Sequence, residues 1–133
     1  MNNFEEMFRI AKEAMNQSNI KEKNHRVGAA VLGKSGKIYS GCCFISIPQD
    51  YCAERVAILK AVSEGEKKID SVLITWYGKL GRIEGPCGIC LNSLWQLSNN
   101  SKLKIILWPT KEKKPLVKEI KDFYPYPYTP SNI

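Results

Sequence analysis

The pattern of apolar and polar positions predicts that helices and strands alternate along the chain. Apolar residues recur at helical spacing from Phe4 to Met15, which predicts an opening amphipathic helix that ends near Asn16 to Ser18. Val27 to Leu32 is apolar and strand-like, and a Gly-Lys-Ser-Gly turn separates it from a returning strand over Lys37 to Phe44. The first part of the chain is therefore expected to form a helix and a β-hairpin.

The alternation continues beyond the hairpin. Ala53 to Glu64 contains strong helix formers and no Gly or Pro, and Gly65 follows it directly, so a helix is expected there. The pattern further predicts strands over Ser71 to Trp76 and Leu103 to Trp108, a helix from Pro86 through about Leu97, and a short final helix over Leu116 to Phe123. This order indicates an α/β fold, with a mixed sheet covered by helices on both faces.

The composition is that of one ordinary globular domain. The chain has 133 residues, of which 44% are hydrophobic and 25% are charged, and it shows no repeat or linker. We therefore predict a single domain over residues 1–133. The sequence has no apolar run of membrane-spanning length, and its acidic, amphipathic start does not resemble a secretion signal. We expect a soluble, unprocessed cytoplasmic protein with no membrane partner.

The net charge of +7 raises the question of nucleic acid, because a basic domain attracts polyanions whatever its fold. Much of the excess comes from the lysines between Lys102 and Lys121. Such a run is more commonly a solvated basic face. Nucleic acid is therefore not the expected partner.

The cysteines suggest a metal site. Their number is odd, two of them form a Cys-x-x-Cys pair, and no export signal is present, so reduced thiols are favoured over disulfides. A catalytic zinc needs three protein ligands and one open position, and Cys52, Cys87 and Cys90 satisfy that count. All three lie at predicted helix starts, where the helix dipole and free amide groups favour thiolates. Gly88, between the paired cysteines, is expected to let the backbone pass close.

Two neighbours of Cys52 suit a catalytic metal. Glu54 follows Cys52 by two positions, so its carboxylate can reach a water at the metal without being a ligand, as a proton shuttle does. Three thiolates and one Zn²⁺ leave a negative charge, and Arg55 is placed to offset it by donating to the sulfurs, as part of the metal's second shell. An ordinary surface arginine is equally compatible with the spacing.

Together these motifs resemble the cytidine deaminase family, whose metal signature is Cys-or-His-Ala-Glu followed by Pro-Cys-x-x-Cys. The chain is similar to its small, all-cysteine branch from Val27 to Cys90. The resemblance implies a three-layer α/β/α fold with a mixed five-stranded sheet, one zinc per subunit, and a homotetramer or homodimer. It also implies a hydrolase of a cyclic amidine C–N bond, which converts cytidine or deoxycytidine to uridine or deoxyuridine and ammonia in pyrimidine salvage.

The resemblance weakens where the family binds the sugar. Cytidine deaminases usually follow the Gly-Cys that matches Gly41-Cys42 with an Asn-x-Glu pair, and here those positions hold Cys43 and Ile45. A thiol is a weak hydrogen-bond partner and isoleucine has no polar side-chain atom. The connection to Cys52 is also shortened and resembles that of blasticidin S deaminases. An alternative substrate is therefore blasticidin S or another aminated nucleoside.

The predicted substrate contacts are Cys43, Ile45, Ala53 and Pro86. Ser46, Gln49 and Asp50 offer replacement polar contacts, although loops are commonly polar. His25, the only histidine, is interpreted as a surface or turn residue.

Four other functions remain open. A structural zinc site would take Cys42 or Cys43 as its fourth ligand. A thiol redox protein would use the Cys-x-x-Cys pair but give the Cys-Ala-Glu motif no purpose. A nucleic-acid deaminase would need a basic, aromatic channel that leads to the zinc. A relative that binds zinc without catalysis would also fit the loss of sugar-binding residues.

Overall fold

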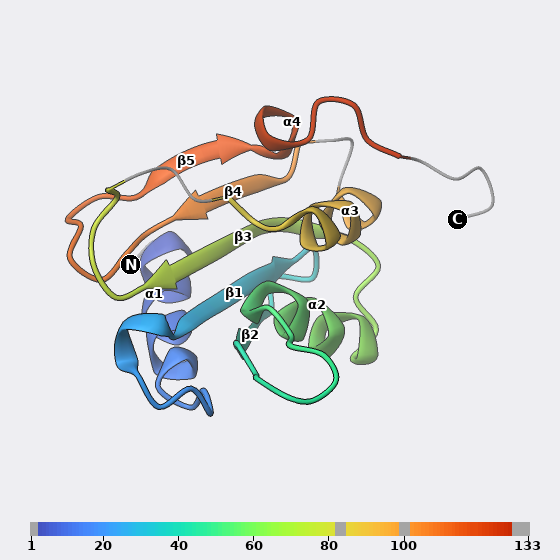
Figure 1. Cartoon of the computed structure of the whole chain (residues 1–133). Coiled ribbons are helices and arrows are strands. Elements are labelled where there is room, and N and C mark those ends of the chain that lie inside the picture. The colour runs from blue at the N-terminus through green and yellow to red at the C-terminus, as the bar shows by residue number, and fades with distance from the viewer. Residues whose placement is uncertain (1–2, 82–84, 99–101, 129–133) are drawn as a thin grey trace.

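The computed structural model describes residues 3–81, 85–98 and 102–128, and its centre is a five-stranded sheet (Figure 1). The strand order is β2-β1-β3-β4-β5. The strands are β1 (Val27–Gly33), β2 (Ile38–Cys42), β3 (Ile69–Trp76), β4 (Lys104–Leu107) and β5 (Leu116–Glu119). Only β3 and β4 pair in parallel, and the other neighbours in this sheet are antiparallel. The sheet is therefore mixed, as predicted.

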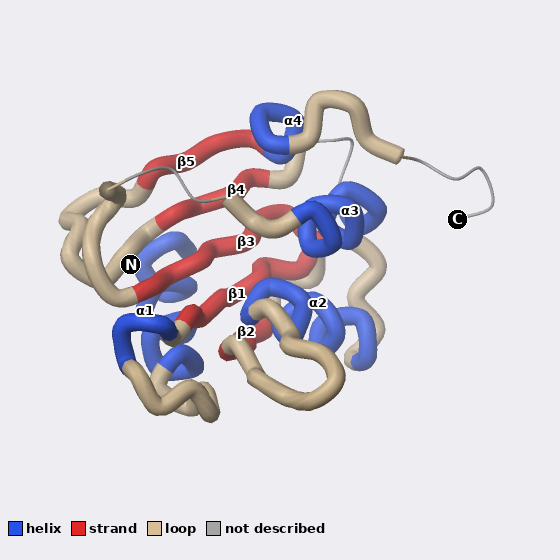
Figure 2. The backbone as a smooth tube through the Cα atoms, viewed as in Figure 1, coloured by secondary structure: helices blue, strands red, loops and turns tan. Residues whose placement is uncertain are grey.

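Helices cover both faces of the sheet (Figure 2). One face carries α1 (Asn3–Met15), and the other carries α2 (Ala53–Ser63) and α3 (Gly88–Leu97). A short 3₁₀ helix, η1 (Lys23–His25), precedes β1, and α4 (Ile120–Phe123) follows β5. The predicted three-layer α/β/α fold is thus confirmed. Among the described residues, no helix has the length and apolar character needed to cross a membrane.

The apolar side chains form one cluster on each face of the sheet. Strand β3 contributes to both, because neighbouring side chains of a strand point to opposite faces. Leu73 packs with Met7 and Ile106 beneath α1, whereas Val72 and Ile74 belong to the cluster beneath α2 and α3. Burial on both faces explains why β3 is apolar along most of its length.

A close backbone contact fixes α2 against the sheet. A Cβ atom at Gly41 of β2 would lie 2.6 Å from the Ala53 carbonyl oxygen and 2.6 Å from the Ala57 nitrogen. Only glycine permits this approach without displacing the helix. Because α2 begins at Ala53, the contact positions the first turn of the helix, where the Cys-Ala-Glu motif lies.

The prediction of a helix over Leu116 to Phe123 is wrong for its first half. Leu116–Glu119 forms β5, which pairs antiparallel with β4, and only Ile120–Phe123 is helical. The edge of β4 offers unpaired backbone groups, and satisfying them outweighs the local preference of four residues. The returning strand of the hairpin is also shorter than predicted and spans Ile38–Cys42.

Candidate metal and catalytic site

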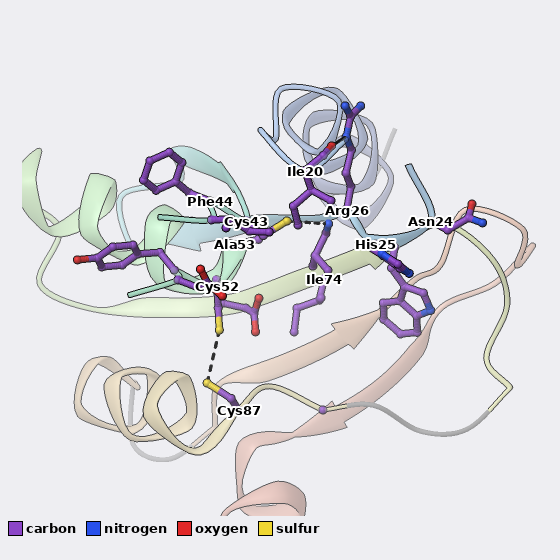
Figure 3. Close-up of a pocket in the computed structure, with 17 residues that line it drawn as sticks. Ile20, Asn24, His25, Arg26, Cys43, Phe44, Cys52, Ala53, Ile74 and Cys87 are labelled. Carbon is purple, nitrogen blue, oxygen red and sulfur yellow. Dashed lines mark hydrogen bonds between the residues drawn. The ribbon is translucent and has the colours of Figure 1, made fainter. Parts of the chain in front are cut away.

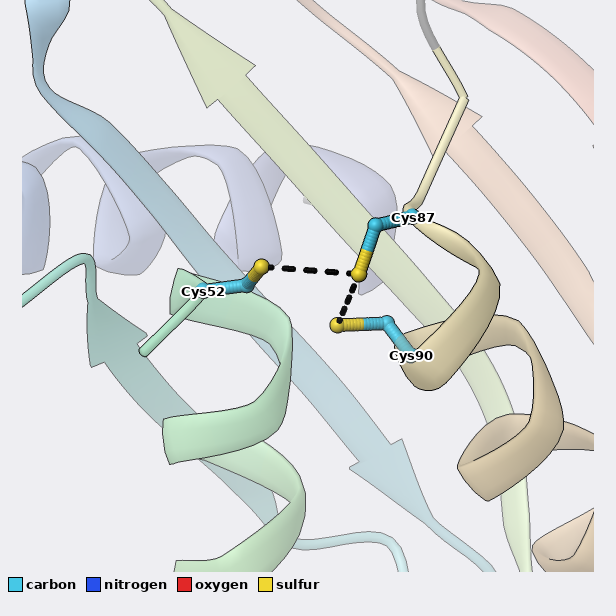
Figure 4. A group of neighbouring side chains, drawn as sticks. All are labelled: Cys52, Cys87 and Cys90. Carbon is cyan, nitrogen blue, oxygen red and sulfur yellow. Dashed lines mark hydrogen bonds between the residues drawn. The ribbon is translucent and has the colours of Figure 1, made fainter. Parts of the chain in front are cut away.

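The three predicted cysteines meet where two helices begin (Figure 4). Cys52 is the N-cap of α2, Cys87 is the N-cap of α3, and Cys90 lies in the first turn of α3. The Cys87 sulfur lies 3.6 Å from that of Cys52 and 3.5 Å from that of Cys90, and all three sulfurs lie within 4.8 Å of one another. Tetrahedral zinc with bonds of about 2.3 Å separates two thiolates by about 3.8 Å. The cluster therefore fits a zinc ion.

The surroundings of the cluster shift the pKa values of its three thiols. Burial, aided by the charge of Glu54, raises the pKa of Cys52 to about 11 and raises the pKa of Cys90 as well. Burial also disfavours the Cys87 thiolate, but hydrogen bonds from the Cys90 backbone and the neighbouring thiols lower the Cys87 pKa below its ordinary value. A metal that binds here must displace protons from the sulfurs, since thiolates are the ligands.

Glu54 lies beside the cluster and is shielded from solvent. It is the second residue of α2 and is only 5% exposed. Burial raises the pKa of its carboxyl, while a hydrogen bond from its own backbone and the charge of Arg55 act in the opposite direction. A carboxyl whose pKa is shifted towards neutrality can both accept and donate a proton near neutral pH.

A cavity of about 630 Å³ joins Cys52, Cys87 and Glu54 to residues from elsewhere in the chain (Figure 3). Its size suits a small molecule. Of the predicted substrate contacts, Cys43, Ile45 and Ala53 line the cavity. Pro86 is buried and lies between two lining residues, Gly85 and Cys87, but is not among the lining residues itself.

Several lining residues were not predicted from the sequence. The wall includes Ile20 and Asn24, which precede β1, and Ile74 and Trp76 at the end of β3. His25 is exposed in η1, as interpreted, but it also lines the cavity. No local motif marks these residues, because the pairing of β1 with β3 is what brings the two segments together.

Arg55 does not make the predicted contact with the sulfurs among the described hydrogen bonds. Its Nη2 donates to the Asp50 carbonyl at 3.3 Å, and its guanidinium carbon lies 5.2 Å from the centre of the Tyr51 ring. Its Nε is buried without a hydrogen-bond partner. Arg55 therefore stabilises the chain just before Cys52, while its Nε–H group has no hydrogen-bond acceptor.

Cys42 and Cys43 lie apart from the metal cluster in the described structure, which groups only Cys52, Cys87 and Cys90. The Cys43 sulfur accepts a hydrogen bond from the Val27 nitrogen at 3.2 Å. A structural site with four cysteines is therefore not formed.

Gly88 does not make the close backbone approach that the sequence predicted, because an added Cβ would meet no described atom within 4 Å.

Comparison with known proteins identifies the family. Residues 1–105 match the family described as the cytidine and deoxycytidylate deaminase zinc-binding region. The chain belongs to this family. As a member of the cytidine deaminase family, the chain is a hydrolase that acts on carbon–nitrogen bonds, and its domain is a zinc-binding one.

Individual relatives support the assignment. A cytidine deaminase of Sporosarcina psychrophila is 31% identical over 102 residues, which cover 73% of this chain and 71% of the relative. A cytidine deaminase of Vibrio vulnificus is 32% identical over 111 residues, covering 80% of this chain but 33% of the longer relative. The crystal structure of a Burkholderia pseudomallei cytidine deaminase shares the fold, with a TM-score of 0.82, 23% identity, and coverage of 96% of this chain and 100% of that chain.

Proposed function

We propose that this family member is a zinc-dependent deaminase of free cytosine nucleosides, which converts cytidine or deoxycytidine to uridine or deoxyuridine and ammonia. The observation that carries the proposal is the cluster of three sulfurs beside the buried Glu54, because two of its cysteines, Cys52 and Cys87, line one cavity together with Glu54. The relatives named cytidine deaminase support the substrate class.

Cys52, Cys87 and Cys90 are the proposed zinc ligands. When bound, zinc acts as a Lewis acid that lowers the pKa of a water molecule towards about 7. The helix N-termini favour thiolates, but burial outweighs them at Cys52 and Cys90, so a bound metal ion would supply the positive charge that these thiolates need. The three residues would leave a fourth ligand position free. Arg55 holds the segment that leads into Cys52 through its bond to Asp50.

Glu54 is the proposed proton-transfer residue. Its carboxylate takes a proton from the attacking water and gives it to the pyrimidine ring nitrogen. The water oxygen becomes the new carbonyl oxygen of the ring, and the amino group leaves as ammonia after it receives a further proton through Glu54. Burial keeps bulk water from competing for these protons.

The remaining predicted contacts shape the substrate site. Ala53 lies between Cys52 and Glu54 and is itself buried, so we assign it to the wall that meets the pyrimidine ring. Cys43 and Ile45 form another part of the wall. Pro86 is assigned the indirect role of fixing the chain before Cys87.

Ammonia release from a substrate panel tests this proposal. The zinc-loaded protein is supplied separately with cytidine, deoxycytidine, cytosine and blasticidin S. Turnover of cytidine or deoxycytidine is expected. Turnover of blasticidin S alone would replace the proposal with an antibiotic-inactivating enzyme. If the zinc-loaded protein released no ammonia from any of the four compounds, catalysis would be contradicted and a relative that only binds zinc would be favoured.

The proposed assembly is a homotetramer in the cytoplasm, where cysteine thiols stay reduced. Large apolar side chains that remain exposed on α2 support association of identical chains: Leu59 and Val62. Sedimentation velocity is expected to give the mass of four chains, and a monomer at micromolar concentration would contradict the assembly.

A further inference from the structure

The polar groups of Cys43 are already bonded within the protein. Its sulfur accepts from the Val27 nitrogen at 3.2 Å and lies 3.2 Å from the hydroxyl of Ser18. The same hydroxyl donates to the Cys43 carbonyl at 2.7 Å. Cys43 thus lines the cavity while its hydrogen-bonding capacity is directed towards the segment that follows α1.

Asn19 holds Ile45 in the same manner. The Asn19 side chain donates from Nδ2 to the Ile45 carbonyl at 2.8 Å, and its Oδ1 accepts from the Ile45 nitrogen at 2.9 Å. Both backbone polar groups of Ile45 are therefore used, and its side chain offers only apolar surface to the cavity. We call residues 43–45 the apolar wall.

The polar residues next to the apolar wall are also engaged with one another. The Ser46 hydroxyl donates to the Gln49 carbonyl at 2.8 Å, and the Ser46 nitrogen donates to Asp50 Oδ1 at 3.2 Å. On the other side, Arg26 Nε donates to the Ile20 carbonyl at 2.6 Å. Of the three predicted replacement contacts, Ser46 and Gln49 do not line the cavity, whereas Asp50 does, two positions before Cys52 and outside the apolar wall.

The cysteine cluster fixes how a cytosine ring would lie. The reacting carbon must face Cys52, Cys87 and Glu54, and the ring nitrogen that carries the sugar lies across the ring from that carbon. Figure 3 shows Cys43 and Ile20 on the side of the cavity away from Cys87. The sugar is therefore directed towards the apolar wall.

Resting on the proposed function, we propose that Ser18 and Asn19 position the apolar wall, and that the site consequently accepts cytosine nucleosides with or without sugar hydroxyls. Ile45 is the specificity-determining residue, and Ser18 and Asn19 are positioning residues. A site built to hydrogen-bond a substrate hydroxyl rejects the analogue that lacks it by about 10⁴-fold or more. The apolar wall makes no such distinction, because the polar lining residues Asn24, His25, Asp50 and Tyr51 come from outside residues 43–45.

The test compares kcat/KM for cytidine, 2′-deoxycytidine and 2′,3′-dideoxycytidine. The wild-type values are expected to lie within about tenfold of one another, and a larger preference for cytidine would overturn the inference. Ile45→Gln adds a hydrogen-bonding group to the wall and is expected to raise the preference for cytidine over dideoxycytidine at least about threefold. An unchanged ratio would also overturn it.

Ile47→Gln is the matched control, because Ile47 lies in the same loop, is 97% exposed and is not among the lining residues. It is expected to leave the substrate ratio unchanged. If wild-type protein deaminates none of the three nucleosides, the proposed function fails. If it deaminates cytidine but rejects dideoxycytidine, only the present inference fails.

Asn19→Ala tests the positioning role. Releasing Ile45 is expected to raise KM severalfold for all three nucleosides while kcat and zinc content stay unchanged, since Asn19 lies outside the metal cluster. Asn19→Asp keeps the acceptor for the Ile45 nitrogen and is expected to restore part of the loss. An unchanged KM, or a fall in kcat with loss of zinc, would refute the positioning role.

Discussion

Replacing Gly41 with alanine places a methyl group between β2 and α2, at the contact that positions the catalytic motif. The new Cβ would lie 2.6 Å from the Ala53 oxygen and 2.6 Å from the Ala57 nitrogen, whereas ordinary contact begins at 3.4 Å. Both are backbone atoms, so no side-chain rotation relieves the overlap. The helix must retreat by roughly 0.8 Å, and because Ala53 lies between Cys52 and Glu54, both move with it.

The expected effects follow from that displacement. Overpacking of a core costs about 1–3 kcal/mol, and a domain of this size loses about 4 °C in Tm per kcal/mol, so Tm should fall by about 4–12 °C. A misplacement of about 1 Å in a catalytic group can cost about 100-fold in rate. We expect kcat/KM for deoxycytidine to fall by about 10- to 100-fold and zinc to bind more weakly.

The assays are thermal unfolding, zinc competition with a chromogenic chelator, and initial rates measured well below Tm. Gly33→Ala is the control, because its Cβ would meet the carboxyl group of Glu66 rather than any atom of α2. It should lower Tm while zinc affinity and kcat stay unchanged. Full activity and unaltered zinc affinity in Gly41→Ala would refute the reasoning, as would an equal loss of zinc affinity in both variants.

Three further predictions concern Gly88, the buried Glu66 and the metal. Gly88→Ala should retain full kcat and zinc content, because the added Cβ meets no described atom within 4 Å, and a loss of activity in rate assays would contradict this. Hydrogen bonds from Ser35 and Tyr39 outweigh burial and keep the pKa of Glu66 below its ordinary value. That stabilisation is present above the ordinary carboxyl pKa and is lost as pH falls through the lower folded-state pKa. Glu66→Gln should therefore have a lower Tm than the wild-type protein at pH 7, and most of this difference in Tm should disappear near pH 3. A difference in Tm that does not change with pH in unfolding scans would refute the assignment. Removal of zinc by dialysis against a chelator should lower Tm and abolish turnover, since the metal binds the folded state, and added zinc should restore both. An unchanged Tm in differential scanning calorimetry would contradict a zinc site formed by folding.

The candidate metal ligands could be predicted because the helix starts that carry them are local features and the family resemblance groups Cys52 with the later Cys-x-x-Cys pair. The helix starts at Cys52 and Cys87 follow from residue preferences within a few positions, and the structure places both at helix N-caps. Glu54 follows from the same short motif. The spacing alone did not determine the partner of Arg55. Its long side chain reaches Asp50 and Tyr51 instead of the sulfurs.

The remaining features depend on contacts between distant segments. Trp76 reaches the cavity because it pairs with Val27, a register that no local pattern specifies. The clamp of Asn19 on Ile45 joins residues 26 positions apart through a side chain that is typical of any turn. Likewise, Leu116–Glu119 becomes a strand only because β4 presents an edge to it. Local propensity contains none of this information.

The central claim is that Cys52, Cys87 and Cys90 bind zinc and that Glu54 moves the protons without being a ligand. The most direct test measures zinc content and ammonia release from deoxycytidine for Glu54→Ala beside the wild-type protein. General acid–base catalysis contributes about 10²- to 10⁴-fold, so the variant should bind one zinc per chain and lose at least about 100-fold in kcat. Retained turnover in the variant, or loss of its zinc, would contradict the account.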